Sequence, residues 1–152
     1  MTYTCEVIER SAQPVLSMRI RTPVHELPEQ LGRVYGAIAQ YLAELSEQPV
    51  GAPFTAYYNM DTQDLDVEIG FPVAKKLPGK EEIQAGQIPG GEFATCLHTG
   101  PYSEVGLAYN VLSTWMQAHG HEPTGIAYEL YLNDPGETPP EKLQTQILFP
   151  LK

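Results

Sequence analysis

The chain has little of the residue types on which several classes of protein depend. Its 152 residues include two cysteines, Cys5 and Cys96, with no C-x-x-C motif and no cysteine–histidine cluster at zinc spacing. The sequence therefore predicts neither a disulfide framework nor a metal site. Nucleophile elbows, glycine-rich phosphate loops and catalytic-triad spacings are also missing. Neither a covalent mechanism nor a bound cofactor is indicated.

Basic residues are scarce as well. Nine Lys and Arg stand against 19 Asp and Glu, which gives a formal net charge of −10. Because nucleic-acid affinity depends on cationic side chains that neutralise phosphates, we expect no direct nucleic-acid binding. A negative surface favours solubility and attracts cationic small molecules.

Long apolar runs are absent too. No stretch approaches the length of a membrane span, and the opening residues MTYTCEVIER lack a positive segment followed by an apolar one. We therefore expect a cytoplasmic protein without a signal peptide and without membrane association.

What the chain does have is an internal repeat. Residues 31–59 align with residues 105–133 at an offset of 74, and the flanking segment VEIGFPV aligns with TQILFPL at an offset of 78. Two copies of about 75 residues would each be marginal alone, so we expect one duplicated domain. Its parts are repeat 1 (residues 1–73), a linker (residues 74–82) and repeat 2 (residues 83–152). The identical matched pairs are Gly32/Gly106, Tyr35/Tyr109, Pro49/Pro123, Gly51/Gly125, Tyr57/Tyr131 and Asn59/Asn133.

Each repeat reads as two strands, a helix and a hairpin. Apolar residues at intervals of three and four predict helices from about Leu27 and over Ser103–His119, the second with Gly120 as its C-terminal cap. The pattern favours an α+β fold in which β-α-β-β units form a largely antiparallel sheet with two packed helices. We expect a groove between the pseudo-twofold halves. The predicted strands are Thr4–Glu9, Pro14–Arg21, Phe54–Asn59, Leu65–Val73, Ile83–Ile88, Phe93–His98, Ile126–Asn133 and Gln144–Leu151.

Glu129 is the main departure from the repeat. In the alternating strand YELYLND it shares a face with Tyr131, while its counterpart in repeat 1 is Thr55. A carboxylate among apolar and aromatic residues is costly unless it is paired, protonated or solvated. We expect a concave site lined by Tyr57 and Tyr131, with Glu129 as its charge, suited to a flat cation. The alternative is a strand carboxylate that faces water.

Several other residues are weaker candidates. Thr55 shares the face of Tyr57. Glu68 shares a face with Gly70, although an exposed strand carboxylate gives the same pattern. Trp115 lies on the apolar side of the second helix, as core or as a border of the site. Tyr102 lies where a strand passes into that helix, as a rim residue or a packing anchor.

The order of motifs resembles a known family. The duplicated unit, TGPY before the second helix, EIGFPV, YELYLND and ILFPL are similar to the GyrI-like small-molecule-binding domain. That domain is the effector-binding module of AraC-type and MerR-type bacterial regulators and is also found free-standing. The resemblance implies ligand binding in the pseudo-twofold groove. In multidrug-sensing members a buried acidic residue in a Y-E-L context meets lipophilic aromatic cations, and Tyr128-Glu129-Leu130 assigns that role to Glu129.

Three functions stay open from the resemblance. Because the repeat begins almost at the N-terminus, we expect a stand-alone member without a DNA-binding domain. The first function is sensing or sequestering lipophilic aromatic compounds, cations among them. The second is hydrolysis of cyclopropane-type genotoxins, with Glu129 as general base and Tyr57 or Tyr131 in support. The third is binding of a protein partner, as gyrase-inhibitory members do. The sequence specifies neither the natural ligand nor the oligomeric state.

Overall fold

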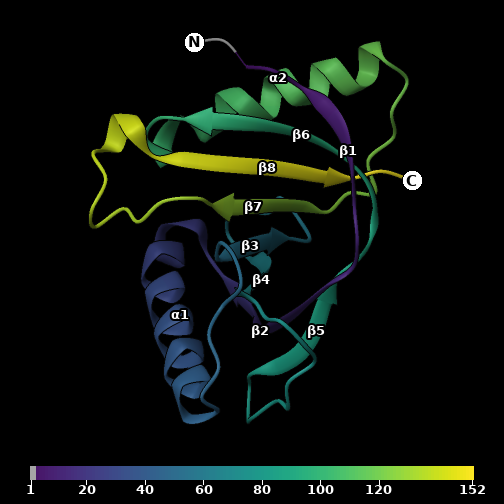
Figure 1. The fold of residues 1–152 in the computed structure, drawn as a ribbon. Coiled ribbons are helices and arrows are strands. Elements are labelled where there is room, and N and C mark those ends of the chain that lie inside the picture. The colour runs from purple at the N-terminus through teal and green to yellow at the C-terminus, as the bar shows by residue number, and fades with distance from the viewer. Residues whose placement is uncertain (1–2) are drawn as a thin grey trace. The chain divides into compact units, whose positions relative to one another are not determined.

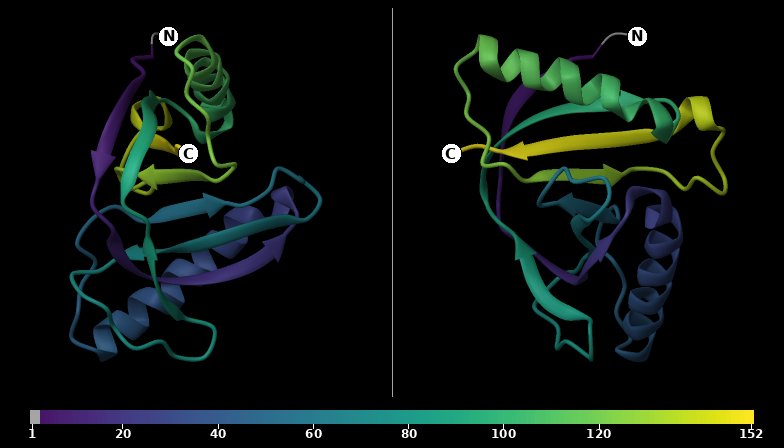
Figure 2. Two further views of the ribbon diagram at one scale, coloured as in Figure 1. Left: turned by 90° about the vertical axis from the view of Figure 1, so that its right-hand side faces the viewer. Right: turned by 180° about the vertical axis from the view of Figure 1, so that it is seen from behind.

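The structure, a computed structural model, describes residues 3–152, which form two compact units. Unit 1 comprises the residues up to Ser11 together with Gly90–Lys152, and unit 2 comprises Ala12–Pro89. Each unit has four antiparallel strands and one long helix (Figures 1 and 2). The predicted α+β class with antiparallel strands and two helices is confirmed.

In unit 2 the strand order is β3-β4-β2-β5. A 3-10 turn, η1 (Val24–Glu26), leads directly into the helix. The elements in chain order are β2 (Gln13–Thr22), η1, α1 (Leu27–Glu44), β3 (Phe54–Tyr57), β4 (Leu65–Pro72) and β5 (Gln84–Ile88).

Unit 1 has the equivalent order, β7-β8-β6-β1, and again a 3-10 turn precedes the helix. The elements are β1 (Glu6–Arg10), β6 (Gly91–Thr99), η2 (Tyr102–Glu104), α2 (Val105–Ala118), β7 (Ala127–Tyr131), η3 (Pro140–Lys142) and β8 (Gln144–Pro150).

The strand register of the two units follows the sequence repeat. Ile20 lies opposite Val67 between β2 and β4, and the residues 78 positions later, His98 and Thr145, lie opposite each other between β6 and β8. At the next pair, Thr55 faces Ile69 in unit 2 where Glu129 faces Ile147 in unit 1. Each unit is therefore an internal reference for the other, position by position.

Each helix packs its apolar side on the sheet of its own unit. In unit 2, Val34, Ile38 and Leu42 of α1 are buried in a core cluster that includes Leu16 and Ile69. The predicted start at Leu27, with Pro28 in the first turn, is confirmed. Burial of each such aliphatic side chain contributes about 1.5–3 kcal/mol to folding.

Unit 1 buries Ala108, Leu112 and Met116 of α2 against Cys96 and Ile147. The helix begins at Val105 rather than at Ser103, because Tyr102–Glu104 forms the 3-10 turn. Gly120 adopts a φ of +71° just beyond the helix, which confirms its role as the C-terminal cap.

The first strand of repeat 1, β1, belongs to unit 1, which otherwise consists mainly of repeat 2. The first strand of repeat 2, β5, belongs to unit 2, which otherwise consists mainly of repeat 1. β1 pairs with β6, and β5 pairs with β2, whose other edge is occupied by β4. The chain segments around residues 10–13 and 89–91 therefore pass from one unit to the other, and neither closes a hairpin between its flanking strands. No helix within residues 3–152 has the length and apolar character needed to cross a membrane.

Candidate functional site

Glu129 is a buried carboxylate in the middle of β7. Its side chain is 7 % exposed. It lies opposite Ile147, which belongs to the core beneath α2, so the carboxylate faces that helix. None of the ion pairs among the described residues involves Glu129. The candidate site is therefore built around an acidic group that is held by hydrogen bonds rather than by an ion pair.

Two tyrosine hydroxyls bind the carboxylate, one to each oxygen. Tyr109, on the sheet-facing side of α2, donates to Glu129 Oε2 at 2.5 Å. Tyr131, two residues along the same strand and hence on the same face, donates to Glu129 Oε1 at 2.9 Å. A carboxylate accepts about four hydrogen bonds, so acceptor capacity remains for a ligand.

The electrostatic balance favours a protonated Glu129 more than usual. Burial raises the pKa of Glu129, while the hydrogen bonds from Tyr109 and Tyr131 and the charge of His98 act in the opposite direction without cancelling it. A nearby cation would favour the ionised form of such a carboxyl group. A raised pKa also suits a general base.

Tyr102 extends the aromatic surface at the start of α2. Its ring packs edge-on against Tyr131 with centroids 5.6 Å apart, and it is 37 % exposed. Burial raises the pKa of the Tyr102 hydroxyl, with smaller contributions from the charges of Asp134 and Glu129. The structure therefore brings three of the predicted residues together in unit 1: Glu129, Tyr131 and Tyr102.

A second buried polar pair lies in the adjacent strands. His98 and Thr145 face each other across β6 and β8, and both are 0 % exposed. His98 Nε2 donates to the Pro101 carbonyl at 3.1 Å, because a carbonyl can only accept, and Nδ1 forms a hydrogen bond with the Tyr3 hydroxyl at 2.9 Å. Thr145 also lies opposite Tyr131. Its hydroxyl is the one buried side-chain polar atom of residues 3–152 that has no hydrogen-bond partner.

The equivalent positions of unit 2 are mostly apolar. Ile20 and Val67 replace His98 and Thr145, Thr55 replaces Glu129, and Val24 replaces Tyr102. The tyrosines of the helices are common to both units. Tyr35 packs against Phe71 as Tyr109 packs against Phe149, with ring centroids 5.2 and 5.6 Å apart. The helix tyrosines are therefore shared by the two units, whereas the polar group around Glu129 is particular to unit 1.

Three of the predicted residues belong to unit 2. Thr55 is fully buried, and Tyr35 donates to its strand at the Phe54 carbonyl, 2.8 Å away. Tyr57 is half-buried and packs against the core of unit 2. Glu68 accepts hydrogen bonds from other residues of the unit, as described next.

Glu68 has two hydrogen-bond donors of its own. Ser17 Oγ and Tyr58 Oη each donate to its carboxylate at 2.6 Å. The Arg19 guanidinium lies 3.7 Å from the centroid of the Tyr58 ring and pairs with Asp66 at 2.7 Å. The hydrogen bond to Arg19 holds the pKa of Asp66 below its usual range.

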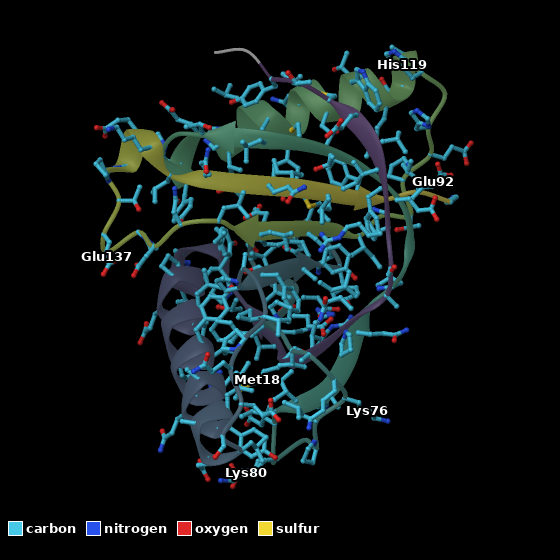
Figure 3. The ribbon with its side chains drawn as sticks, in the orientation of Figure 1. Met18, Lys76, Lys80, Glu92, His119 and Glu137 are labelled. Atoms are coloured by element: carbon cyan, nitrogen blue, oxygen red, sulfur yellow. The ribbon has the colours of Figure 1, made fainter. Side chains whose placement is uncertain are left out.

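Trp115 lies away from these groups, towards the C-terminal end of α2. Its ring stacks on His119 and His121 with centroids 4.6 and 5.4 Å apart. His119, labelled in Figure 3, ends the helix and donates through Nδ1 to the Trp115 carbonyl at 2.8 Å. No group of three or more potential metal ligands occurs among residues 3–152.

Comparison with known proteins identifies the family. The model of the GyrI-like small molecule binding domain matches residues 3–152. The chain belongs to the GyrI-like family. The resemblance seen in the sequence motifs is confirmed, and the chain is a GyrI-like small-molecule-binding domain. A comparison with curated proteins finds no match.

Solved structures share the GyrI-like fold at low sequence identity. EcmrR in a DNA complex has a TM-score of 0.86 at 23 % identity, over 99 % of this chain and 57 % of the EcmrR chain, so this chain spans little more than half of that protein. The isolated EcmrR C-terminal domain has a TM-score of 0.79 at 21 % identity, over 100 % and 99 % of the two chains.

Two further structures with this fold are a hydrolase and a ligand complex. A hydrolase from Listeria innocua has a TM-score of 0.68 at 17 % identity, over 97 % of this chain and 91 % of its own. A protein solved with bound tetraphenylphosphonium has a TM-score of 0.65 at 10 % identity, over 100 % and 94 %. At these identities the likeness concerns the fold.

Some residues of the site were not foreseen from the sequence. Tyr109 has the helical spacing of a core residue; it packs as core and also binds Glu129. The sequence signal for this contact was the repeat itself, because the equivalent tyrosine, Tyr35, precedes Thr55 by the same 20 residues that separate Tyr109 from Glu129. His98 and Thr145 carried a signal too, because each stands where the repeat has a branched aliphatic residue.

Proposed function

We propose that this GyrI-like domain binds lipophilic aromatic compounds, with a preference for cations, at Glu129 in unit 1. The carrying observation is a buried carboxylate held by two phenol hydroxyls, with no ion pair within the described residues. A cationic ligand would supply the missing charge, and aromatic faces attract cations by about 0.5–2 kcal/mol.

The chemistry of the site explains why charge and aromatic character would both matter. Burial makes ionisation of Glu129 costly, and a neutral apolar ligand does nothing to offset that cost. A cation makes the ionised form favourable and gains from the same low-polarity surroundings. Tyr131 and Tyr102 offer ring surface next to the carboxylate. Such a site would recognise a class of ligands rather than a single molecule.

The comparisons support this assignment without specifying the ligand. One structure of the same fold was solved with tetraphenylphosphonium, a lipophilic aromatic cation, and another belongs to the C-terminal domain of EcmrR. We extend that ligand class to this chain because Glu129 supplies the negative charge such a cation needs.

Isothermal titration with tetraphenylphosphonium tests the proposal. Glu129→Gln keeps the shape of the side chain and removes its charge, so we expect affinity to fall by about 1–3 kcal/mol, roughly fivefold to 150-fold. Glu92→Gln is the matched control, because it removes one exposed carboxylate from the same unit (labelled in Figure 3). Neutral triphenylphosphine oxide should bind wild type and Glu129→Gln alike. Equal loss in both variants, or no loss in Glu129→Gln, would remove Glu129 from the site.

Hydrolysis is a second candidate, favoured by the same carboxylate and by the similarity to a structure described as a hydrolase. Glu129 would take a proton from water as the water oxygen attacks a ring carbon of an activated cyclopropane. The ring C–C bond breaks, and its electron pair passes into the conjugated system, where a hydroxyl such as that of Tyr131 stabilises the developing phenolate.

Turnover separates the two functions. Incubation with a cyclopropane-bearing electrophile, followed by mass spectrometry, should show the hydrated ring-opened product from wild type and none from Glu129→Gln if the protein is a hydrolase. Retention of unchanged ligand by wild type supports binding alone. Tyr57→Phe, measured in both assays, tests the predicted part of Tyr57 in either function.

A further inference from the structure

The outer side of α2 carries no charge in a strongly acidic protein. Residues Val105–Ala118 contain no Asp, Glu, Lys or Arg, although the chain has a net charge of −10. Leu107 and Val111 are 52 % and 40 % exposed on this side. The helix runs along the surface of unit 1 (Figure 1). An exposed apolar helix face of this kind is unusual, because solvent-facing helix positions ordinarily carry charged or polar residues.

The repeat shows that the fold does not require this composition. At the position of Leu107 the equivalent helix α1 has the exposed Arg33, and at the position of Ala118 it has the exposed Glu44. Glu44 pairs with Lys80 at 3.3 Å, as expected for a face in contact with solvent. The two helices pack on equivalent sheets, so the packing of the fold does not account for the absence of charge on α2.

The shape of this side also fits another helix. A shallow hollow of about 450 Å³ is lined by Asn110, Val111, Thr114, Trp115 and Ala118. The last four stand at positions i, i+3, i+4 and i+7, which is the arrangement of a hole in knobs-into-holes helix packing. Leu107 lies one turn before the hollow and projects as a knob of the same helix.

The knob and the hole are placed so that two copies of this helix complement each other. A twofold axis through Val111 relates position 107 to position 115, because each lies four residues from the axis. Leu107 of one copy would then enter the hollow of the other, and the reverse contact follows from symmetry. We infer that α2 is a self-association surface, packed antiparallel against α2 of a second copy of this chain.

Charge favours a second copy over other partners. Two chains of −10 repel each other wherever their acidic groups meet, and the outer side of α2 avoids this repulsion. A basic partner would be expected to bind through carboxylates, and α2 has none. The 14-residue helix is about 21 Å long, so the contact lies at the small end of specific interfaces. We expect a dimer that dissociates in roughly the micromolar range.

Sedimentation velocity over a range of concentrations tests the inference. Wild type should pass from monomer to dimer, and added salt should strengthen the dimer by screening the repulsion between acidic copies. Leu107→Arg introduces the residue that α1 has at this position and should weaken association by at least roughly thirtyfold. Ser113→Arg is the control, because Ser113 is exposed on the same helix but about 120° around it from Leu107. Circular dichroism confirms that each variant is folded.

Three results would overturn the inference. They are a wild type that stays monomeric up to about millimolar concentration, a Leu107→Arg variant that still dimerises, and an equal effect of Ser113→Arg. Cross-linking checks the geometry independently. A short bismaleimide should join two copies of Val111→Cys, whose introduced thiols lie at the twofold axis, far more than two copies of Ser113→Cys. Equal cross-linking of the two variants would contradict the antiparallel arrangement.

Discussion

Tyr109 and Glu129 come from different elements of unit 1 and meet at 2.5 Å, the phenol donating to the carboxylate. In unit 2 the equivalent pair is Tyr35 and Thr55, whose oxygens lie 3.4 Å apart. The same tyrosine position therefore contacts a hydroxyl in unit 2 and donates to a carboxylate in unit 1.

Glu129 should make the protein less stable as the pH rises. Its pKa is about 4.5 in the unfolded chain and higher in the folded one, so between these values the folded state holds a proton that the unfolded state has lost. The free energy of unfolding therefore falls with increasing pH through this window. Glu129→Gln should remove that fall and be more stable than wild type at pH 7. Urea unfolding of both proteins from pH 4 to pH 8 provides the measurement, with Glu92→Gln as control. A parallel pair of pH profiles would contradict the raised pKa.

Removal of either phenol hydroxyl should raise the pKa of Glu129 further. Tyr109→Phe and Tyr131→Phe each delete one hydrogen bond to the carboxylate, which is worth about 1.5–3 kcal/mol when the partner is ionised. The pH at which cation binding reaches half its maximum should therefore move upward in both variants. Tyr35→Phe, the same change in unit 2, should leave this midpoint in place. Titration with tetraphenylphosphonium at several pH values would show whether the shift is confined to the unit 1 variants.

Thr145→Val should not destabilise the protein, although it alters a fully buried residue. The Thr145 hydroxyl is buried without a partner, and a group in that state costs about 1–3 kcal/mol. Valine has nearly the same shape, and unit 2 has Val67 at the equivalent position. We expect a thermal midpoint equal to or above that of wild type. Thr95→Val is the informative comparison, because Thr95 donates to the Ile147 carbonyl at 2.7 Å and its loss should lower the midpoint. A lower midpoint for Thr145→Val would show that its hydroxyl is satisfied.

Cys96 should resist alkylation while the protein is folded. Burial raises the pKa of Cys96 to about 12, with the nearby Cys5 adding to the effect. Almost no thiolate is present at pH 8, and the thiolate is the reactive form. Incubation with iodoacetamide and peptide mass spectrometry should show modification of Cys96 only after unfolding. Rapid labelling of the folded protein would contradict the burial of Cys96.

The sequence was sufficient for the elements and for singling out Glu129 as an unusual carboxylate. Apolar periodicity placed α1 and α2, and the comparison of Glu129 with Thr55 pointed to the one buried carboxylate of β7. It was not sufficient for the pairing of β1 with β6, since a strand's own residues do not reveal which of several antiparallel edges it joins.

The partners of Glu129 were harder to predict for a related reason. Tyr109 has the spacing of a core residue, and packing and hydrogen bonding are compatible in a tyrosine. The buried His98 ring forms a hydrogen bond with Tyr3, which lies 95 residues away in sequence. Contacts of this kind follow from tertiary packing rather than from any local pattern.

The crossed pairing of β1 and β5 also limits how this chain can be divided. A cut within residues 74–82 would produce two fragments, each deprived of an edge strand that the other carries. Neither fragment would be expected to fold well by itself, yet the two should reassemble when they are produced together. The two repeats therefore depend on each other for a complete set of strands in each unit.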